Sequence, residues 1–180
     1  MIKKWQKLKS KAIGNFGVFQ IWQNTSFSPR TGKEHTFYVL DSANWVNVIP
    51  ITPEGKVVLI HQFRHGTEEV TLEIPGGIVD ASDSDPAASA RRELVEETGY
   101  DTENIIQIGE VTPNPAILNN HCYTFLAKDV QLTYKQAFDS SEDIDVELFD
   151  LEAIPELIQN GRITHALVVA AFYHFEQFCK

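Results

Sequence analysis

Short stretches in which apolar and polar residues alternate, many of them rich in β-branched side chains, recur along most of this chain. Such stretches, bounded by turn-forming residues, predict β-strands. The predicted strands are 16–23, 35–40, 46–51, 57–63, 70–74, 105–111, 121–127 and 145–150. Longer segments with apolar residues three to four positions apart predict helices at 86–98, 151–159 and 163–178. The pattern therefore predicts an α+β fold in which a mixed sheet lies between helices.

The first of these helices has start and stop signals at both ends. Asp85 is suited to the N-cap, Pro86 to the first helical position, and Gly99 to a left-handed C-cap. Ala90 and Leu94 fall on one side of the helix and are expected to pack on the sheet.

Three carboxylates share another stripe of the same helix. Glu93, Glu96 and Glu97 stand at i, i+3 and i+4, so their side chains leave one face. Such a run can be a solvated helix face. Here, however, a predicted strand and a loop that contains Gly76 and Gly77 precede the helix, and glycines let backbone groups approach a ligand closely. Because Mg²⁺ prefers oxygen ligands and meets substrates through phosphates, the arrangement indicates a divalent-metal site for phosphate chemistry.

Composition narrows the classes of protein. The 180 residues suit one domain with a small extension, and 43% hydrophobic residues are enough for a core. A net charge of −10 speaks against a nucleic-acid-binding surface. The sequence shows neither a signal peptide nor an apolar run of membrane-spanning length, so a cytoplasmic location and no membrane partner are expected. Two cysteines give no disulfide framework and no metal-binding spacing.

The stretch from Gly77 to Tyr100 resembles the Nudix box, G-x5-E-x7-R-E-U-x-E-E-x-G-U, where U is aliphatic. Arg92-Glu93-Leu94-Val95-Glu96-Glu97-Thr98-Gly99 matches the second half at every specified position. The first half departs from the pattern: one residue is inserted, and Ser84 stands where the pattern has glutamate. In the family that glutamate often braces the loop, and Asp83 or Asp85 is a possible substitute.

Further segments resemble the ADP-ribose and nucleoside-diphosphate-sugar pyrophosphatase branch of this family. They are Leu-Glu-Ile-Pro-Gly-Gly at 72–77, Gln-Phe-Arg at 62–64, Pro115 and Gly-Arg-Ile-Thr-His-Ala at 161–166. The resemblance implies a Nudix α/β/α sandwich at 45–180 with a mixed sheet, and an amino-terminal antiparallel β extension at 1–44. In this branch such extensions form homodimers and contribute to the nucleotide pocket. Trp22, Phe37 and Tyr38 are therefore candidates to stack on a base, although aromatic residues in strands are more often core.

By the same resemblance, Glu93 and Glu97 are the principal ligands of Mg²⁺, with Mn²⁺ as an alternative. Glu96 is a further ligand or a catalytic helper, and the Gly76 carbonyl is a backbone ligand. The implied reaction is hydrolysis of the pyrophosphate bond of a nucleoside diphosphate sugar.

Other candidate residues lie outside the box. The acidic run 139–143 is the counterpart of a loop that supplies the general base in this branch, and Glu142 is the first choice. Arg64 is suited either to clamp the diphosphate or to form a salt bridge, and Glu73 either to bind a sugar hydroxyl or to pair with Arg64. Four histidines have no metal-ligand spacing, so solvated or core roles are expected for His61, His65, His121 and His165.

Three functions remain open at this point. The first is a Mg²⁺-dependent hydrolase of ADP-ribose or of a nucleoside-diphosphate hexose such as GDP-mannose. The second is a catalytically silent Nudix domain that binds such metabolites as a sensor. The third is a Nudix enzyme acting on nucleoside triphosphates or capped RNA.

Overall fold

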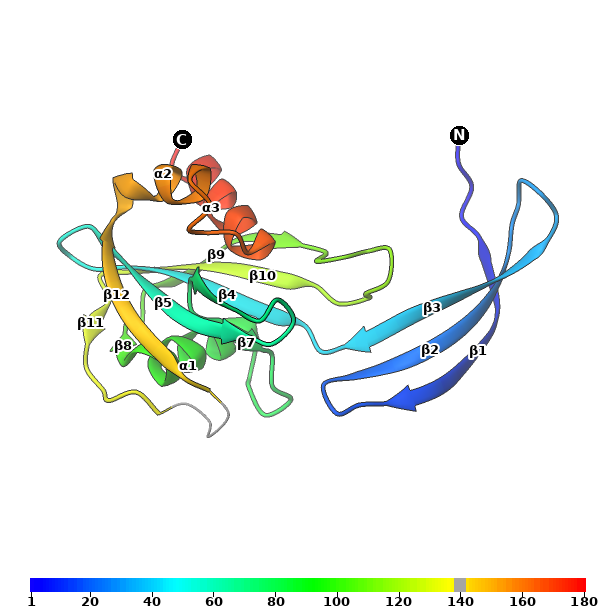
Figure 1. Cartoon of the computed structure of the whole chain (residues 1–180), viewed down its shortest axis with the longest axis horizontal. Helices are drawn as coiled ribbons and strands as arrows, with labels where there is room; N and C mark the ends of the chain where they lie inside the picture. Colours follow the sequence, from blue (N-terminus) through cyan, green and yellow to red (C-terminus); the bar gives the residue numbers. More distant parts are fainter. Residues whose placement is uncertain (138–141) are drawn as a thin grey trace. The chain divides into compact units, whose positions relative to one another are not determined.

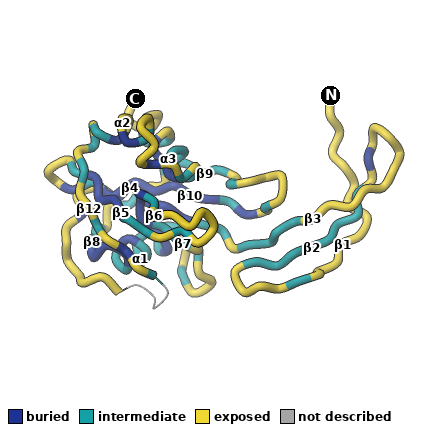
Figure 2. The backbone as a smooth tube through the Cα atoms, viewed as in Figure 1, coloured by how far each residue is buried: buried dark blue, intermediate teal, exposed yellow. Residues whose placement is uncertain are grey.

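The computed structural model describes residues 1–137 and 142–180, and it divides the chain into two compact units. Unit 1 comprises Met1–Ala43 and Thr112–His121, and unit 2 comprises Asn44–Val111 and Cys122–Lys180. The segment Thr112–His121, expected to belong to the main domain, joins unit 1 because Leu40 pairs with Leu118 and donates its N–H to the Ile117 carbonyl at 2.7 Å. Figure 2 shows that buried backbone is concentrated in unit 2.

Unit 1 is built on a three-stranded antiparallel sheet in the order β1-β2-β3 (Figure 1). Its strands are β1 (Gln6–Asn15), β2 (Phe19–Phe27) and β3 (Glu34–Ser42). The first strand was not predicted, because its lysine-rich segment is exposed almost throughout and shows no apolar face. It pairs with β2 through the backbone. The second strand begins at Phe19 and not at position 16, since Gly17 makes a turn with φ of 80°.

Unit 2 contains a seven-stranded mixed sheet. Five strands follow the order β12-β5-β4-β10-β9, while β6 pairs with β5 and β7 with β4. The strands are β4 (Trp45–Ile51), β5 (Lys56–Arg64), β6 (Glu69–Glu73), β7 (Gly76–Ile78), β9 (Ile105–Val111), β10 (Cys122–Lys128) and β12 (Ile144–Asp150). A small separate ladder joins β8 (Tyr100–Asp101) to β11 (Gln131–Leu132). Strands β4 and β10 run parallel and the other pairs are antiparallel, so the predicted mixed sheet is confirmed.

Helices cover both faces of this sheet (Figure 1). They are α1 (Pro86–Thr98), α2 (Ile154–Gln159) and α3 (Ala166–Phe178), with a 3-10 turn at Leu151–Ala153. Alternate residues of β5 separate the two cores: Val58 packs with α1, while Val57 and Leu59 pack with α2 and α3. The α+β layering predicted from the pattern is confirmed.

Helix α1 has the predicted bounds and caps. The Asp85 carboxylate accepts the N–H of Ala88, and Gly99 adopts φ of 75° and donates its N–H to the Val95 carbonyl. Two other helical predictions were too long. Residues 151–153 form a 3-10 turn before α2. Helix α3 begins at Ala166, because residues 163–165 are not helical and His165 is extended, with φ −65° and ψ 118°. Within the described residues, no helix is both long and apolar enough to span a membrane.

Candidate active site

Strand β7 is formed by the two glycines that the sequence analysis placed in a loop, and that assignment is corrected here. Gly76 and Gly77 pair with Asn47 and Val46 of β4. A Cβ at Gly76 would lie 2.3 Å from the Val46 carbonyl oxygen, and a Cβ at Gly77 would lie 2.4 Å from Oε1 of Glu93. At Gly76 the neighbouring strand backbone leaves no room for a side chain, whereas at Gly77 a side chain would displace the Glu93 carboxylate. The predicted close approach is therefore made by strand backbone.

Two of the three predicted glutamates are directed at this glycine strand. Glu93 lies against Gly77, and Oε2 of Glu97 accepts the Gly76 N–H at 2.9 Å. The Glu97 residue is only 2% exposed. Burial raises the pKa of Glu93 to about 7, although Arg92 opposes the effect. Burial likewise raises the pKa of Glu97 well above its usual range, and the neighbouring charge of Glu93 adds to it. These carboxylates are therefore desolvated and mutually repulsive, as expected of a site that receives a cation.

The third glutamate is held by an arginine network. Arg92 Nη1 lies 2.9 Å from Glu96 Oε2, the predicted i,i+4 pair, and 2.9 Å from Glu93 Oε1. Its Nη2 donates to the Ile78 carbonyl of β7 at 3.1 Å. On the other side, Asp83 accepts from Arg92 at 3.2 and 3.3 Å. Of the two proposed substitutes for the missing box glutamate, Asp83 braces the loop, whereas Asp85 caps α1.

A second network surrounds Glu73 at the end of β6. Glu73 is 2% exposed and accepts two hydrogen bonds from Arg64, each 2.8 Å long. It also accepts one from Thr71 at 2.6 Å and lies 2.5 Å from Nδ1 of His165. Burial would raise the pKa of Glu73, but these hydrogen bonds outweigh it and hold that pKa well below its usual range. The Arg64–Glu73 pair left open by the sequence is present. The role of His165 was missed, because it lies 92 positions from its partner.

The second network lies within electrostatic reach of the α1 carboxylates. The charges of Glu97 and Glu142 both contribute to raising the pKa of Arg64, and Glu142 also raises the pKa of Glu93 and Glu97. Arg64 keeps 40% of its side chain exposed. The charge of Glu142, the predicted base, thus acts on the predicted ligands Glu93 and Glu97. Three other residues of its acidic run, Asp139, Ser140 and Ser141, lie outside the described residues.

The carboxylates of α1 are paired with protein groups and leave no ready-made cation cage among the described residues. Across residues 1–137 and 142–180, no three His, Cys, Asp or Glu side chains are already arranged to hold a metal ion. The reason is that Glu93 and Glu96 pair with Arg92 while Glu97 accepts a backbone N–H. The donor chemistry, carboxylates beside the half-buried backbone of two glycines, suits a hard divalent cation. The residues fit the group once these side chains turn from their protein partners.

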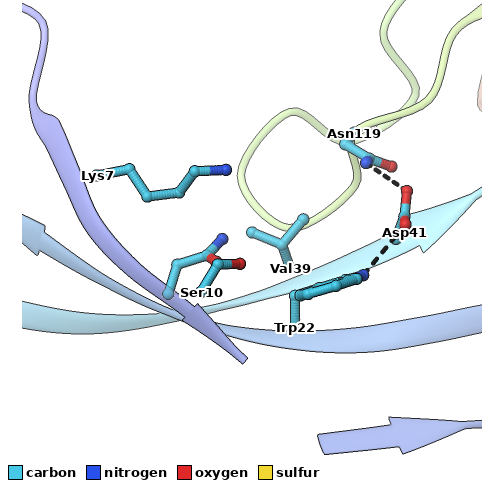
Figure 3. Close-up of a pocket in the computed structure, with 7 residues that line it drawn as sticks. Lys7, Ser10, Trp22, Val39, Asp41 and Asn119 are labelled. Atoms are coloured by element: carbon cyan, nitrogen blue, oxygen red, sulfur yellow. Dashed lines mark hydrogen bonds between the residues drawn. The ribbon is translucent and has the colours of Figure 1, made fainter. Parts of the chain in front are cut away.

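Unit 1 carries a pocket of about 410 Å³ on one face of its sheet (Figure 3). Trp22 lies along it, and the indole N–H donates to Asp41 at 3.1 Å, while Asn119 donates to the same carboxylate at 2.6 Å. Trp22 pairs with Val39 across β2 and β3, so the next residue, Tyr38, belongs to the opposite face. Of the three predicted stacking residues, Trp22 and Tyr38 therefore do not share one surface of the sheet. Phe37 shares the Trp22 face and packs edge-on against Trp5.

An acidic helix face against a glycine strand, on a mixed sheet between helices, defines a class of phosphate-processing enzyme. Comparison with known proteins specifies the family. A profile of the NUDIX domain matches residues 41–172. The ADP-ribose pyrophosphatase of Bacillus subtilis (strain 168) is 28% identical over 146 residues, covering 81% of this chain and 78% of the relative. The GDP-mannose pyrophosphatase of Cronobacter sakazakii is 28% identical over 152 residues, covering 79% of this chain and 78% of the relative. The crystal structure of an ADP compounds hydrolase superposes with a TM-score of 0.85 at 17% identity, covering 99% of this chain and 95% of that one.

The chain therefore belongs to the Nudix family. The expected likeness to the ADP-ribose and nucleotide-sugar pyrophosphatases is confirmed, as are the Nudix fold and the enzyme class, a Nudix pyrophosphohydrolase.

Proposed function

We propose that the protein hydrolyses the pyrophosphate bond of a nucleoside diphosphate sugar, in a reaction that depends on Mg²⁺ or Mn²⁺. The observation that carries this proposal is the convergence of Glu93 and Glu97 on Gly76 and Gly77, with the charge of Arg64 close enough to act on Glu97. The ADP-ribose pyrophosphatase and GDP-mannose pyrophosphatase among its relatives support this class of substrate.

In this proposal the cation is held by Glu93, Glu96 and Glu97 together with the Gly76 carbonyl. When bound, a divalent cation activates water and stabilises negative charge on phosphate oxygens. Arg64 donates to a phosphate of the substrate with the exposed part of its guanidinium, because Glu73 already fixes Nε and Nη2. Glu73 therefore orients Arg64 and is a substrate-binding residue mainly through it.

The chemical step is attack of a water oxygen on one phosphorus. The bond from that phosphorus to the bridging oxygen breaks, and the bridging oxygen leaves with the other phosphate. Glu142 accepts the proton of the attacking water as general base. The products are a nucleoside monophosphate and a sugar phosphate. Glu96, which is shared with Arg92, serves as a further ligand or as a helper in this proton transfer.

Base recognition is assigned in this proposal to unit 1. The Trp22 ring is held by Asp41 in a hollowed surface, so it offers a fixed face for stacking. Tyr38 lies on the opposite face of the sheet, where its hydroxyl accepts a hydrogen bond from Gln23 at 3.2 Å. Tyr38 can therefore contact only a base that binds to this opposite face. We further propose a homodimer formed through the amino-terminal strands and a cytoplasmic location, both following from the resemblance to this branch.

A substrate panel tests the function directly. ADP-ribose, GDP-mannose, ADP-glucose and UDP-glucose are incubated with Mg²⁺, and released monophosphates are measured by phosphatase-coupled phosphate detection. We expect turnover of at least one, a loss of two orders of magnitude or more in Glu97→Gln, and no change in Glu103→Gln, whose side chain is 91% exposed. If calorimetry shows that these compounds bind but none is hydrolysed, the proposed enzyme function would be rejected in favour of a sensor.

The general base is tested separately. Glu142→Gln removes the proton acceptor but keeps its size, so kcat should fall while KM changes little. Unchanged turnover in Glu142→Gln would reject this role for Glu142 and leave the cation site unaffected.

A further inference from the structure

The box of this chain departs from the family pattern where a bracing glutamate is expected. Ser84 occupies that position, one residue is inserted, and the Ser84 hydroxyl donates to Asp85 at 3.4 Å. No hydrogen bond or ion pair joins Ser84 to Arg92 among the described interactions. Another residue must therefore hold Arg92 in this chain.

Asp83 makes that contact. Its Oδ2 accepts from Arg92 Nη2 at 3.2 Å and from Arg92 Nε at 3.3 Å. The same oxygen accepts the hydroxyl of Ser89, a fully buried residue of α1, at 2.8 Å. The Asp83 side chain is 11% exposed. Because one carboxylate oxygen accepts from both Ser89 and Arg92, it holds the guanidinium against the side of α1 and leaves it little freedom.

The inserted residue is taken up just before this contact. The Asp83 N–H donates to the Asp80 carbonyl at 3.1 Å, and the Ser82 N–H donates to the Asp80 carboxylate at 2.7 Å. These two bonds close a tight turn that delivers Asp83 to Arg92. The shorter side chain of aspartate, one position earlier than the pattern's glutamate, thus reaches the same arginine.

The position of Arg92 matters because this side chain contacts groups of the proposed cation site. It contacts Glu93 and Glu96, two of the proposed cation ligands, and the carbonyl of Ile78 at the end of the glycine strand. Groups that orient metal ligands from outside the coordination sphere typically change metal affinity or activity by about 10- to 100-fold when they are removed.

We propose that Asp83 is a positioning residue of the cation site, which replaces the box glutamate by fixing Arg92 and, through it, Glu93 and Glu96. This inference rests on the proposed function for the identity of the site, but its test does not require turnover.

The test is Mn²⁺ binding to the whole, substrate-free protein, measured from the electron paramagnetic resonance signal of free Mn²⁺. Asp83→Asn keeps the size of the side chain and removes its charge, and the Mn²⁺ dissociation constant should rise about tenfold. Asp80→Asn is the matched control, because it removes the same charge from the same turn, has no hydrogen bond to Arg92, and keeps a side-chain oxygen that can accept the Ser82 N–H. This control should stay within about twofold of the wild type.

A wild-type Mn²⁺ affinity in Asp83→Asn, or an equal loss in Asp80→Asn, would overturn the proposal. If Asp83→Asn does not fold, Asp83→Ala gives the same test with a smaller side chain. For a substrate that the wild type hydrolyses, Asp83→Asn should also need about tenfold more Mg²⁺ for half-maximal rate. Its KM for that substrate at saturating Mg²⁺ should be unchanged, since Asp83 does not contact Arg64. A protein that binds Mn²⁺ in this Asp83-dependent way but hydrolyses nothing in the panel would refute the enzyme and keep the positioning role.

Discussion

The buried carboxylate of Glu73 gives the sharpest prediction about stability. It is 2% exposed and has three partners, Arg64, His165 and Thr71. The variant Glu73→Gln keeps the shape of the side chain, removes its charge and turns an NH₂ group toward donors. Removal of one partner from a buried ion pair typically costs 3–5 kcal/mol. Because Arg64 is 40% and His165 37% exposed, both regain water in the variant. We therefore expect a loss of about 2–3 kcal/mol.

This loss is measured by urea unfolding at pH 7, followed by far-UV circular dichroism. With an unfolding entropy of about 2.1 cal/mol/K per residue, a 180-residue chain should lose roughly 5–8 °C in Tm. The control is Glu147→Gln, which removes another glutamate paired to a histidine at 2.8 Å but 51% exposed, and should cost below about 0.5 kcal/mol. The reasoning fails if Glu73→Gln loses under about 1 kcal/mol or no more than Glu147→Gln.

Three further predictions concern the pH dependence of stability, the two glycines of β7 and the two cysteines. The partners of Glu73 lower its pKa, so the stabilising effect of this carboxylate is complete above about pH 4.5 and is lost as the pH falls further. Below pH 4.5, the urea midpoint of Glu73→Gln should therefore depend less steeply on pH than that of the wild type. Equal slopes would contradict this prediction. In Gly76→Ala the new methyl group meets backbone, so the free energy of unfolding in urea should fall by about 1–3 kcal/mol. In Gly77→Ala it meets only the movable carboxylate of Glu93, so activity should fall more than stability. A larger loss of stability in Gly77→Ala than in Gly76→Ala would be inconsistent with the pairing of β7. Burial raises the pKa of the Cys122 thiol to about 12, whereas Cys179 is exposed. A thiol reagent should therefore modify only Cys179 in the folded protein. Rapid modification of both cysteines would contradict the burial of Cys122.

Local signals in the sequence were sufficient for the elements that have them. The bounds of α1 follow from Asp85, Pro86 and Gly99, because each of these residues has a conformational preference that acts on its immediate neighbours. Strand β1 was missed since its burial is slight and its pairing with β2 is made by backbone, which leaves no apolar alternation to detect. Strand β7 was missed because two glycines carry no side-chain pattern.

The site divides in the same way. The pairing of Arg92 with Glu96 is a property of helix geometry, so spacing alone predicted it. The contact of Glu73 with His165 joins β6 to the start of α3, and no periodic signal links residues so far apart. The separation of Trp22 and Tyr38 onto two faces depends on the strand register, and a shift of one residue would have reversed it.

We propose that the α1 glutamates bind a divalent cation and that the protein with this cation hydrolyses a nucleoside diphosphate sugar. The most direct test of this proposal is ³¹P nuclear magnetic resonance of ADP-ribose incubated with the wild type or with Glu97→Gln, each with Mg²⁺ or with a chelator. We expect the diphosphate resonances to be replaced by two phosphomonoester resonances only when wild-type protein and Mg²⁺ are both present. Equal conversion by Glu97→Gln, or conversion in the chelator, would contradict the account.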